Sequence, residues 1–365
     1  MEKIKAAILG PSGMVGRVGC VELANHPYFD VIGYYGDKSA GHNLGMAIKE
    51  REVRLMTHYG AWKELLQFPK EFYDIKISPL NINGLVDKNV KVAFSLMKKN
   101  AETWEIEQQI AARGIKVFSN MGEGRMLDDI LLGICDINGD KFDSVKGQKS
   151  YKNSGGYIVK NTNCTTAGLV VSLKPIIDYC KNKNIKIENI NVFTSQALSG
   201  KGDDAYPKGL IERNTIYKIK DEEKKVKEES SKILGIEIHK IVALCTRSDI
   251  QNGHGEGVII RTDKLVDMND LKEYIDSYDP LEDYNLPTHA KPLFIMEDNK
   301  FSYELPNHRE VMERIKLSKG ISVGMVRLTQ EDKVIKYDIV SDNLRRGAIL
   351  QSIYNAEYMA HKGLI

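Results

Sequence analysis

The chain has 365 residues, of which 42% are hydrophobic and 28% charged, a composition typical of a soluble globular protein with about two domains. Its 52 basic and 50 acidic residues nearly balance, which argues against nucleic acid or an anionic membrane surface as a partner. Five cysteines without a CxxC pair, no signal-peptide pattern and no apolar run of about 20 residues predict a cytoplasmic protein with free thiols and no membrane span.

The first predicted unit is a strand, a glycine-rich turn, a helix and a second strand. Residues 4–9 predict a short buried strand, residues 15–24 a helix and residues 29–35 the next strand. Three glycines, Gly10, Gly13 and Gly16, lie between the first strand and the helix. A turn that uses glycine only for backbone freedom is the alternative. The order of the elements nevertheless favours a dinucleotide site, where backbone N–H groups and a helix N-terminus approach a pyrophosphate.

The residues after the second strand bear on the choice of coenzyme. Asp37 stands at about the distance where an acid would hold the ribose of NAD. Lys38 and Ser39 could instead hold the additional phosphate of NADP. The local sequence leaves both coenzymes open.

The remaining elements predict two kinds of sheet. A helix over 101–113, between strands at 90–95 and 115–119, continues the parallel sheet. Later strand-like segments are separated by helical patterns, and we expect them to form a more antiparallel sheet; they are 185–197, 258–261, 321–328 and 334–340. The chain ends in an amphipathic helix predicted over 346–362.

This order of elements predicts an α/β protein with two domains. A Rossmann-type parallel-sheet domain is expected from residues 1–160, completed by 344–365. An α+β domain for catalysis and oligomerisation is expected from residues 161–343.

Cys164 is the candidate nucleophile. It lies between polar neighbours and just before a helix predicted over 169–180. A helix N-terminus favours the thiolate, so we expect a lowered pKa for this thiol. A buried inert thiol is the alternative, and the other four cysteines are interpreted that way or as surface thiols. His254, between two glycines, is the candidate acid and base partner.

Five short motifs carry a resemblance to a known family. They are Asn-x-Asn-Cys-Thr-Thr at 161–166, Ser-Gln-Ala-Leu-Ser-Gly at 195–200, Glu-Glu-Ser-Ser-Lys-Ile-Leu at 228–234, Arg-x6-His at 247–254 and Ser-Asp-Asn-Leu-Arg-Arg-Gly-Ala at 341–348. With these motifs in this order, the chain resembles the aspartate-semialdehyde dehydrogenases over nearly its full length. The short stretches of sequence resemble the compact archaeal and fungal branch of this family rather than its longer bacterial form. The resemblance implies NADPH-dependent reduction of 4-phospho-L-aspartate through a cysteine thioester, in the biosynthesis of lysine, threonine and methionine. It also implies a homodimer or homotetramer built through the second domain.

The resemblance also implies residue roles, and no metal. Cys164 would attack the acyl phosphate, Gln196 would orient the thioacyl group, and His254 would act as acid and base. The implied substrate contacts are Arg247 for the carboxylate, Glu229 for the amine, Lys232 and Arg125 for the phosphate, and Asn163. The implied coenzyme contacts are Gly10, Ser12, Gly13, Met14, Val15, Gly16, Lys38, Ser39 and Ser95, with Asn343 near the nicotinamide.

Three alternatives and three departures from the family pattern bear on this interpretation. Malonyl-CoA reductase shares the architecture and the cysteine chemistry, but its substrate has no amine for Glu229 to bind. N-acetylglutamyl-phosphate reductase is less compatible with the motifs around the cysteine. A non-catalytic NADP-binding regulator would be expected to lose Cys164, His254 or Arg247, and all three are present. The departures are Glu123, a carboxylate beside the proposed phosphate arginine, and residues 201–221 and 280–320, which resemble the family only loosely.

Overall fold

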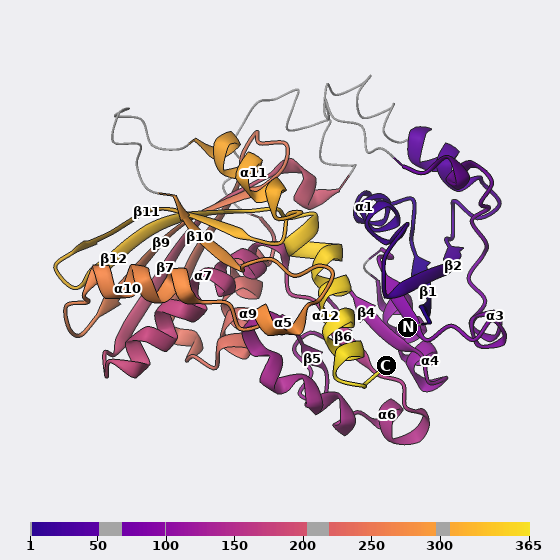
Figure 1. Ribbon diagram of the computed structural model, residues 1–365, viewed down its shortest axis with the longest axis horizontal. Helices are drawn as coiled ribbons and strands as arrows, with labels where there is room; N and C mark the ends of the chain where they lie inside the picture. Colours follow the sequence, from indigo (N-terminus) through magenta and orange to yellow (C-terminus); the bar gives the residue numbers. More distant parts are fainter. Residues whose placement is uncertain (1, 51–67, 99, 203–218, 297–306) are drawn as a thin grey trace.

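The computed structural model describes residues 2–50, 68–98, 100–202, 219–296 and 307–365. Figure 1 shows two regions, each built around its own sheet, with the C-terminal helix α12 (Leu350–His361) between them in this view. Among the described residues, no helix combines the length and the apolar character needed to cross a membrane.

The first sheet has six strands, all parallel, in the order β2-β1-β3-β4-β6-β5. Its strands are β1 (Ile4–Leu9), β2 (Phe29–Tyr35), β3 (Val92–Ser95), β4 (Lys116–Ser119), β5 (Leu131–Leu132) and β6 (Ile158–Lys160). The helical elements of this region are α1 (Met14–Leu23), η1 (Lys70–Tyr73), α3 (Ile82–Asp87), α4 (Ala101–Ala112), α5 (Cys135–Asn138), η2 (Gly139–Gly147) and α6 (Lys149–Ser154). The predicted parallel sheet is confirmed, although the short strands β5 and β6 were not predicted.

The second sheet is mixed, in the order β10-β11-β12-β9-β7-β8. Two pairs, β7 with β8 and β10 with β11, are parallel, and the other neighbours are antiparallel. Its strands are β7 (Ile187–Gln196), β8 (Ile241–Arg247), β9 (His254–Thr262), β10 (Leu293–Met296), β11 (Val323–Glu331) and β12 (Val334–Ser341). The helical elements around it are α7 (Cys164–Asn182), η3 (Leu198–Lys201), α9 (Glu222–Leu234), η5 (Ile238–Lys240), α10 (Met268–Ser277), η6 (Glu282–Tyr284) and α11 (His308–Leu317).

The two faces of this sheet are covered differently. Helix α7 packs across one face, where it shares an apolar core with inward-facing residues of the strands. On the opposite face, α11 covers only part of β11 and β12, through a small cluster that includes Val311, Ile315 and Val326. Alternate residues of each strand therefore face either a packed helix layer or an open surface.

Three predicted boundaries are wrong, and each error lies at a motif. Helix α7 begins at Cys164 rather than at residue 169, and β9 begins at His254 rather than at 258. The predicted C-terminal helix starts with a π-helical turn, η7 (Arg345–Ile349), in which Ala348 has φ −150°. This turn packs closely against the start of α7, because a Cβ on Gly347 would lie 2.8 Å from the Cβ of Cys164.

Candidate active site

Cys164 is the first residue of α7, and the neighbouring asparagine fixes the start of this helix. The Asn163 side chain accepts hydrogen bonds from the backbone N–H groups of Thr165 at 2.9 Å and Thr166 at 3.4 Å. Asparagine is preferred at this position because its oxygen satisfies N–H groups that lack a partner within the helix. The thiol is half-buried, and its Sγ lies 3.1 Å from Nε2 of His254.

His254 is fully buried at the start of β9, and its ring is held on several sides. Its Nδ1 accepts a hydrogen bond from the backbone N–H of Ala197 at 3.0 Å. A Cβ on Gly200 would lie 2.9 Å from Cε1 of His254 and 3.0 Å from Nη1 of Arg247, so only glycine leaves room for both side chains. Burial, then the charges of Arg247 and His308, lower the pKa of His254 to about 3. The imidazole is therefore neutral at pH 7.

The predicted lowering of the Cys164 pKa is wrong. Burial of the thiol, followed by the charge of Glu222, raises its pKa to about 12. Arg247, Arg125 and a hydrogen bond from the Thr165 backbone act in the opposite direction but do not offset burial. A helix start can be read from a sequence, whereas the extent to which the fold covers the thiol cannot.

Gln196 lies between a carboxylate and a guanidinium. Its Nε2 donates to Oε1 of Glu222 at 3.1 Å, and its Oε1 accepts from Nη2 of Arg247 at 3.4 Å. Arg247 also donates from Nη1 to the carbonyl of Ala197. These two hydrogen bonds fix the orientation of the Gln196 amide.

Two buried carboxyl groups at this site were not predicted. Glu222, the first residue of α9, also accepts from Lys225 at 3.2 Å and from Thr165 at 3.3 Å. Glu256, two residues after His254 in β9, has a pKa raised well above its usual value by burial and then by Glu222. Nothing in the charge-rich segment around Glu222 separates it from the neighbouring surface residues.

Arg125 and Glu229, both predicted to bind substrate, form a buried ion pair. Nη1 of Arg125 lies 2.9 Å from Oε1 of Glu229, and Nη2 donates to the carbonyl of Asn120 at 3.0 Å. The other oxygen of Glu229 accepts a hydrogen bond from the backbone N–H of Asn163 at 2.5 Å, one residue before Cys164. These charges therefore lie at the start of the Cys164 helix, as their predicted roles require.

Lys232 has a different environment from the one that a phosphate ligand would suggest. Its Nζ donates to three backbone carbonyls, those of Arg125 at 2.8 Å, Leu127 at 2.7 Å and Ile130 at 3.1 Å. Three donors to three acceptors use all the protons of the ammonium group. Lys232 therefore fastens the turn that carries Arg125, and its direct contact with phosphate stays a prediction.

The glycine turn after β1 fits a dinucleotide pyrophosphate. Gly10 has φ +84°, in the left-handed region that favours glycine, and a Cβ on Gly16 would lie 2.1 Å from the carbonyl oxygen of Gly10. Gly13 is the N-cap of α1 and makes no side-chain hydrogen bond to the first backbone N–H groups of this helix, which are the groups that would bind an anion. Ser12, Met14 and Val15, also predicted as coenzyme contacts, belong to the same turn and first helical residues.

The other predicted coenzyme contacts have different surroundings. Lys38 is exposed, and Ser39 folds back so that a Cβ on Gly36 would lie 2.4 Å from its Oγ. Asn343 is buried, and its Oδ1 accepts the backbone N–H of Gly253 at 2.9 Å, which ties the loop before His254 to the end of β12.

Ser95 is fully buried in a polar cluster that was not predicted. Its Oγ donates to Oε1 of Glu107 at 2.5 Å, and Ser119 donates to the same oxygen at 2.7 Å. Lys160 completes the cluster with an ion pair to Glu107. Glu123, one of the departures noted above, favours the charged form of Lys160, although burial is the larger effect and lowers its pKa.

Family models and relatives match nearly the whole chain. Residues 5–145 match the semialdehyde dehydrogenase NAD binding domain, and residues 173–346 match the semialdehyde dehydrogenase dimerisation domain. Aspartate-semialdehyde dehydrogenase of Archaeoglobus fulgidus is 30% identical, and the alignment covers 100% of both chains. The chain belongs to the aspartate-semialdehyde dehydrogenase family. Its reaction is the reductive dephosphorylation of aspartyl phosphate with a nicotinamide coenzyme, a step in the biosynthesis of the aspartate family of amino acids.

Two further relatives bear on the fold and on the alternative substrate. Candida albicans aspartate-semialdehyde dehydrogenase, solved with NADP, has a TM-score of 0.80 at 24% identity over 100% of both chains, a likeness of fold. A malonyl-CoA reductase (NADP) of Metallosphaera sedula is 26% identical over 99% of this chain and 98% of its own. The predicted family and fold class are thus confirmed, and the domain boundaries stay a prediction.

Proposed function

We propose that the chain reduces 4-phospho-L-aspartate to L-aspartate-4-semialdehyde with NADPH, through a thioester on Cys164. The observation that carries this proposal is the contact of 3.1 Å between Sγ of Cys164 and Nε2 of His254 at the start of α7. An acyl phosphate is activated toward a thiol nucleophile, so a cysteine held beside a hydrogen-bonding partner suits the first step.

The substrate's three charged groups match the charges near Cys164. Arg247 would bind the carboxylate, because a guanidinium fork suits a carboxylate. The ammonium group would bind Glu229, and the phosphate would bind Arg125. Since Arg125 and Glu229 are paired with each other at 2.9 Å, the substrate would insert between them and exchange one ion pair for two.

Malonyl-CoA is the second candidate substrate, and the relative of 26% identity favours considering it. Malonyl-CoA carries no amine, so Glu229 would have no cation to bind other than Arg125. The buried Glu229 therefore favours the aspartyl substrate.

NADPH is the proposed coenzyme. When bound, the nicotinamide supplies the hydride that reduces the thioester. The turn around Gly10 and Gly16 would hold the pyrophosphate, and exposed Lys38 with Ser39 would hold the 2′-phosphate. The solved relative with NADP supports this choice over NAD.

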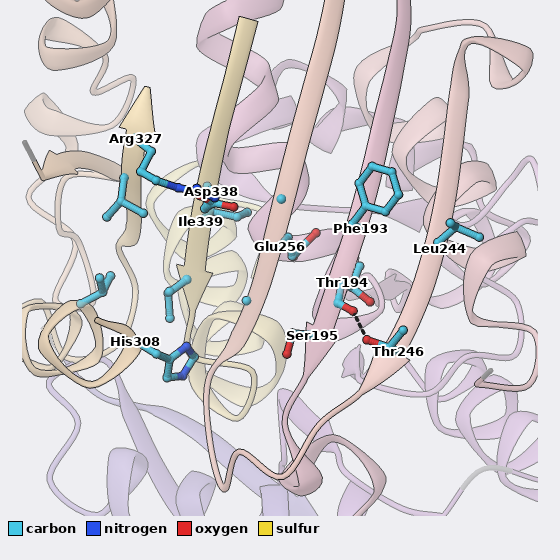
Figure 2. A pocket seen from close by; sticks show the side chains of 15 residues that line it. Phe193, Thr194, Ser195, Leu244, Thr246, Glu256, His308, Arg327, Asp338 and Ile339 are labelled. Carbon is cyan, nitrogen blue, oxygen red and sulfur yellow. Dashed lines mark hydrogen bonds and ion pairs between the residues drawn. The ribbon is translucent and has the colours of Figure 1, made fainter. Parts of the chain in front are cut away.

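A homodimer is the proposed assembly, formed by the open face of the second sheet. A groove of about 490 Å³ lies on this face. Figure 2 shows Phe193 and Leu244 on one side of it and Arg327 on the other. Phe193, Val242 and Leu244 are 48%, 52% and 53% exposed, an unusual density of large apolar side chains for a surface that stays in water. The dimerisation-domain match covers this sheet, whereas a tetramer would need a further contact.

The first experiment measures NADP reduction by L-aspartate-4-semialdehyde with and without inorganic phosphate. Wild type should be active only with phosphate, and Cys164→Ala should lose at least about 10⁴-fold because the covalent step has no nucleophile. Cys180→Ala, in the buried end of the same helix, is the matched control and should keep its activity. Wild-type turnover of malonyl-CoA but not of the semialdehyde would reject the aspartyl substrate.

A further inference from the structure

Three neighbouring strands of the first sheet end in buried polar residues. Ser95, Ser119 and Lys160 are the last residues of β3, β4 and β6, and the strand register places them opposite one another. The carboxyl ends of parallel strands meet at one edge of the sheet, where ligands bind in this class of fold. All three side chains are fully buried at that edge, so their contacts help to set the position of the loops that follow.

Lys160 is joined to its neighbours by the carboxylate of Glu107 on α4. One carboxylate oxygen accepts hydrogen bonds from Ser95 and Ser119, and the other forms the ion pair with Lys160. Nζ of Lys160 also donates to Oγ of Ser119 at 3.0 Å. A lysine is almost never fully buried unless it is paired, and this one has a carboxylate and a hydroxyl as partners.

The hydroxyl of Ser119 connects this cluster with the loop that leads to Arg125. It donates to the carboxylate on α4 and accepts from Lys160 and from the backbone N–H of Met121 at 3.1 Å. Its one proton and its two lone pairs are therefore all used. At the other end of the loop, Arg125 donates to the carbonyl of Asn120 at 3.0 Å. The loop is thus held both where it leaves β4 and at the arginine.

Trp104 connects the same ammonium group with the turn of Arg125. It lies three residues before Glu107, on the same face of α4. Nζ of Lys160 lies 4.6 Å from the centre of the Trp104 ring, within the range of a cation–π contact. Gly124 has φ +83°, and a Cβ there would lie 2.8 Å from Cη2 of Trp104. The indole ring therefore contacts Lys160 as well as the residue just before Arg125.

The loop that carries Cys164 begins directly after Lys160. The backbone N–H of Asn161 donates to the carbonyl of Ser119 at 2.8 Å, and Nδ2 of Asn161 donates to Oδ1 of Asn120 at 2.7 Å. The loop toward the nucleophile and the loop toward the proposed phosphate arginine are therefore fastened to each other where both leave the sheet.

We infer that Lys160 is a positioning residue, whose buried ammonium group fixes the turn of Arg125 relative to the loop of Cys164. The inference rests on the proposed function, in which Arg125 binds the phosphate that Cys164 displaces. Attack requires Sγ to come within about 3–3.5 Å of the acyl carbon while the phosphate stays on its arginine. The relative position of the two loops therefore governs how well the phosphate binds at the nucleophile.

Steady-state kinetics with L-aspartate-4-semialdehyde, NADP and inorganic phosphate give the first test. Lys160→Met removes the charge and keeps an unbranched side chain, and it should raise KM for phosphate about tenfold or more. KM for NADP should stay within about twofold, because the turn around Gly10 lies outside the cluster. Lys116→Met, at the opposite end of β4, is the matched control and should change neither constant. Equal rises in both KM values would indicate a general loss of structure and overturn the inference.

A second variant covers the case in which Lys160→Met fails to fold, because that change leaves Glu107 without its cation. Glu107→Gln combined with Lys160→Met removes both charges, so no unpaired charge stays buried. The same rise in KM for phosphate is expected, since the links from the ammonium group to Ser119 and Trp104 are still missing. A wild-type KM for phosphate in the double variant would overturn the inference, because the ammonium group would then be dispensable.

Tryptophan fluorescence tests the same coupling without semialdehyde or coenzyme. The chain has two tryptophans, so Trp62→Phe leaves Trp104 as the single reporter. Inorganic phosphate should change its emission in a saturable way, and adding Lys160→Met should raise the Kd for phosphate about tenfold or more. Adding Arg125→Gln instead should also weaken binding, because it removes the proposed ligand.

The two substitutions separate this inference from the proposed function. Weaker phosphate binding in the Arg125 variant, with unchanged binding in the Lys160 variant, would overturn the inference alone. Unchanged binding in both variants would also reject the role of Arg125 as the phosphate ligand. If phosphate did not change the emission at all, Trp104 would not sense the turn of Arg125, and the inference would fail.

Discussion

Strands β7, β8 and β9 of the second sheet contribute both to the candidate active site on one face and to the proposed dimer surface on the other. The inward-facing residues at the site are Gln196, Arg247 and His254, and the outward-facing residues next to them are Ser195, Thr246 and Gly255. The inner residues are held by specific hydrogen bonds at fixed distances, whereas the outer residues line an open groove (Figure 2). Because successive residues of a strand point to opposite faces, a single peptide separates each of these predicted site residues from the proposed dimer surface.

This comparison predicts that the inner face tolerates far less change in shape than the outer face. Gly200→Ala should lower kcat/KM by about 10²–10³-fold, because the added Cβ would displace His254 and Arg247, and a shift of about 1 Å can cost 10²-fold. Steady-state kinetics with the semialdehyde and phosphate measure this effect. Gly147→Ala is the matched control, since a Cβ there meets nothing within 4 Å. A loss below threefold in Gly200→Ala would show that the site can adjust.

The outer face is most sensitive to charge. Leu244→Glu should weaken the dimer by about 30-fold or more, because the loss of a hot-spot contact near the centre of an interface costs about 2 kcal/mol or more. Sedimentation velocity over a range of protein concentrations measures the change. Leu265→Glu, at a residue that is 64% exposed but lies outside the groove, is the control and should remain dimeric. Equal dissociation in both variants, or in neither, would place the interface elsewhere.

The two faces should also differ in how pH acts on them. In the folded chain the pKa of His254 is lowered to about 3, while an unfolded histidine titrates near 6.5. Between these values the unfolded state binds the additional proton, so the free energy of unfolding should fall by about 1.4 kcal/mol per pH unit as pH drops below 6.5. Denaturant titrations at pH 7.5, 6.0 and 5.0 should show that His254→Gln removes this slope.

His308, on the outer side, is the matched comparison for this pH dependence. It lines the groove, and its pKa is also lowered, mainly by burial. His308 is only half-buried. His308→Gln should therefore change the fall in unfolding free energy below pH 6.5 less than His254→Gln does. If the two substitutions changed the pH dependence of the unfolding free energy equally, His254 would be held in its neutral form no more strongly than His308.

The sequence predicted the parts of the molecule that depend on local patterns. The glycine turn around Gly10, the parallel sheet and the pairing of Cys164 with His254 all follow from motifs whose residues are close in the chain or known from the family. The edge strands β8 and β10 were not predicted, and neither was the inward position of Glu222. These features depend on long-range packing, which decides which charged residues of a helix are buried.

The pKa of Cys164 is a second property that depends on long-range packing and was not predicted correctly from the sequence. A helix N-terminus lowers a thiol pKa, and the sequence indicated one correctly. Burial raises it, and the balance is set by α7 packing under η7, where Gly347 lies against Cys164. Residue order alone does not show how deeply the fold buries a thiol, so it could not show that burial outweighs the helix N-terminus.

A single substitution at Glu222 tests the effects that raise and lower the pKa of Cys164. Glu222→Gln should speed alkylation of Cys164 by about three- to tenfold at pH 9, since removing a nearby negative charge lowers the thiol pKa. The same change should lower kcat, because Gln196 loses the carboxylate that orients its amide at 3.1 Å.

Glu228→Gln, on the same helix and paired only with Lys224 among the described ion pairs, is the control and should change neither rate. Faster alkylation with unchanged kcat would mean that Glu222 acts on Cys164 alone. A lower kcat without faster alkylation would mean that it acts only through Gln196. The structure predicts that Glu222→Gln raises the alkylation rate of Cys164 and lowers kcat. Only this result would show that one carboxylate both raises the pKa of Cys164 and orients the amide of Gln196.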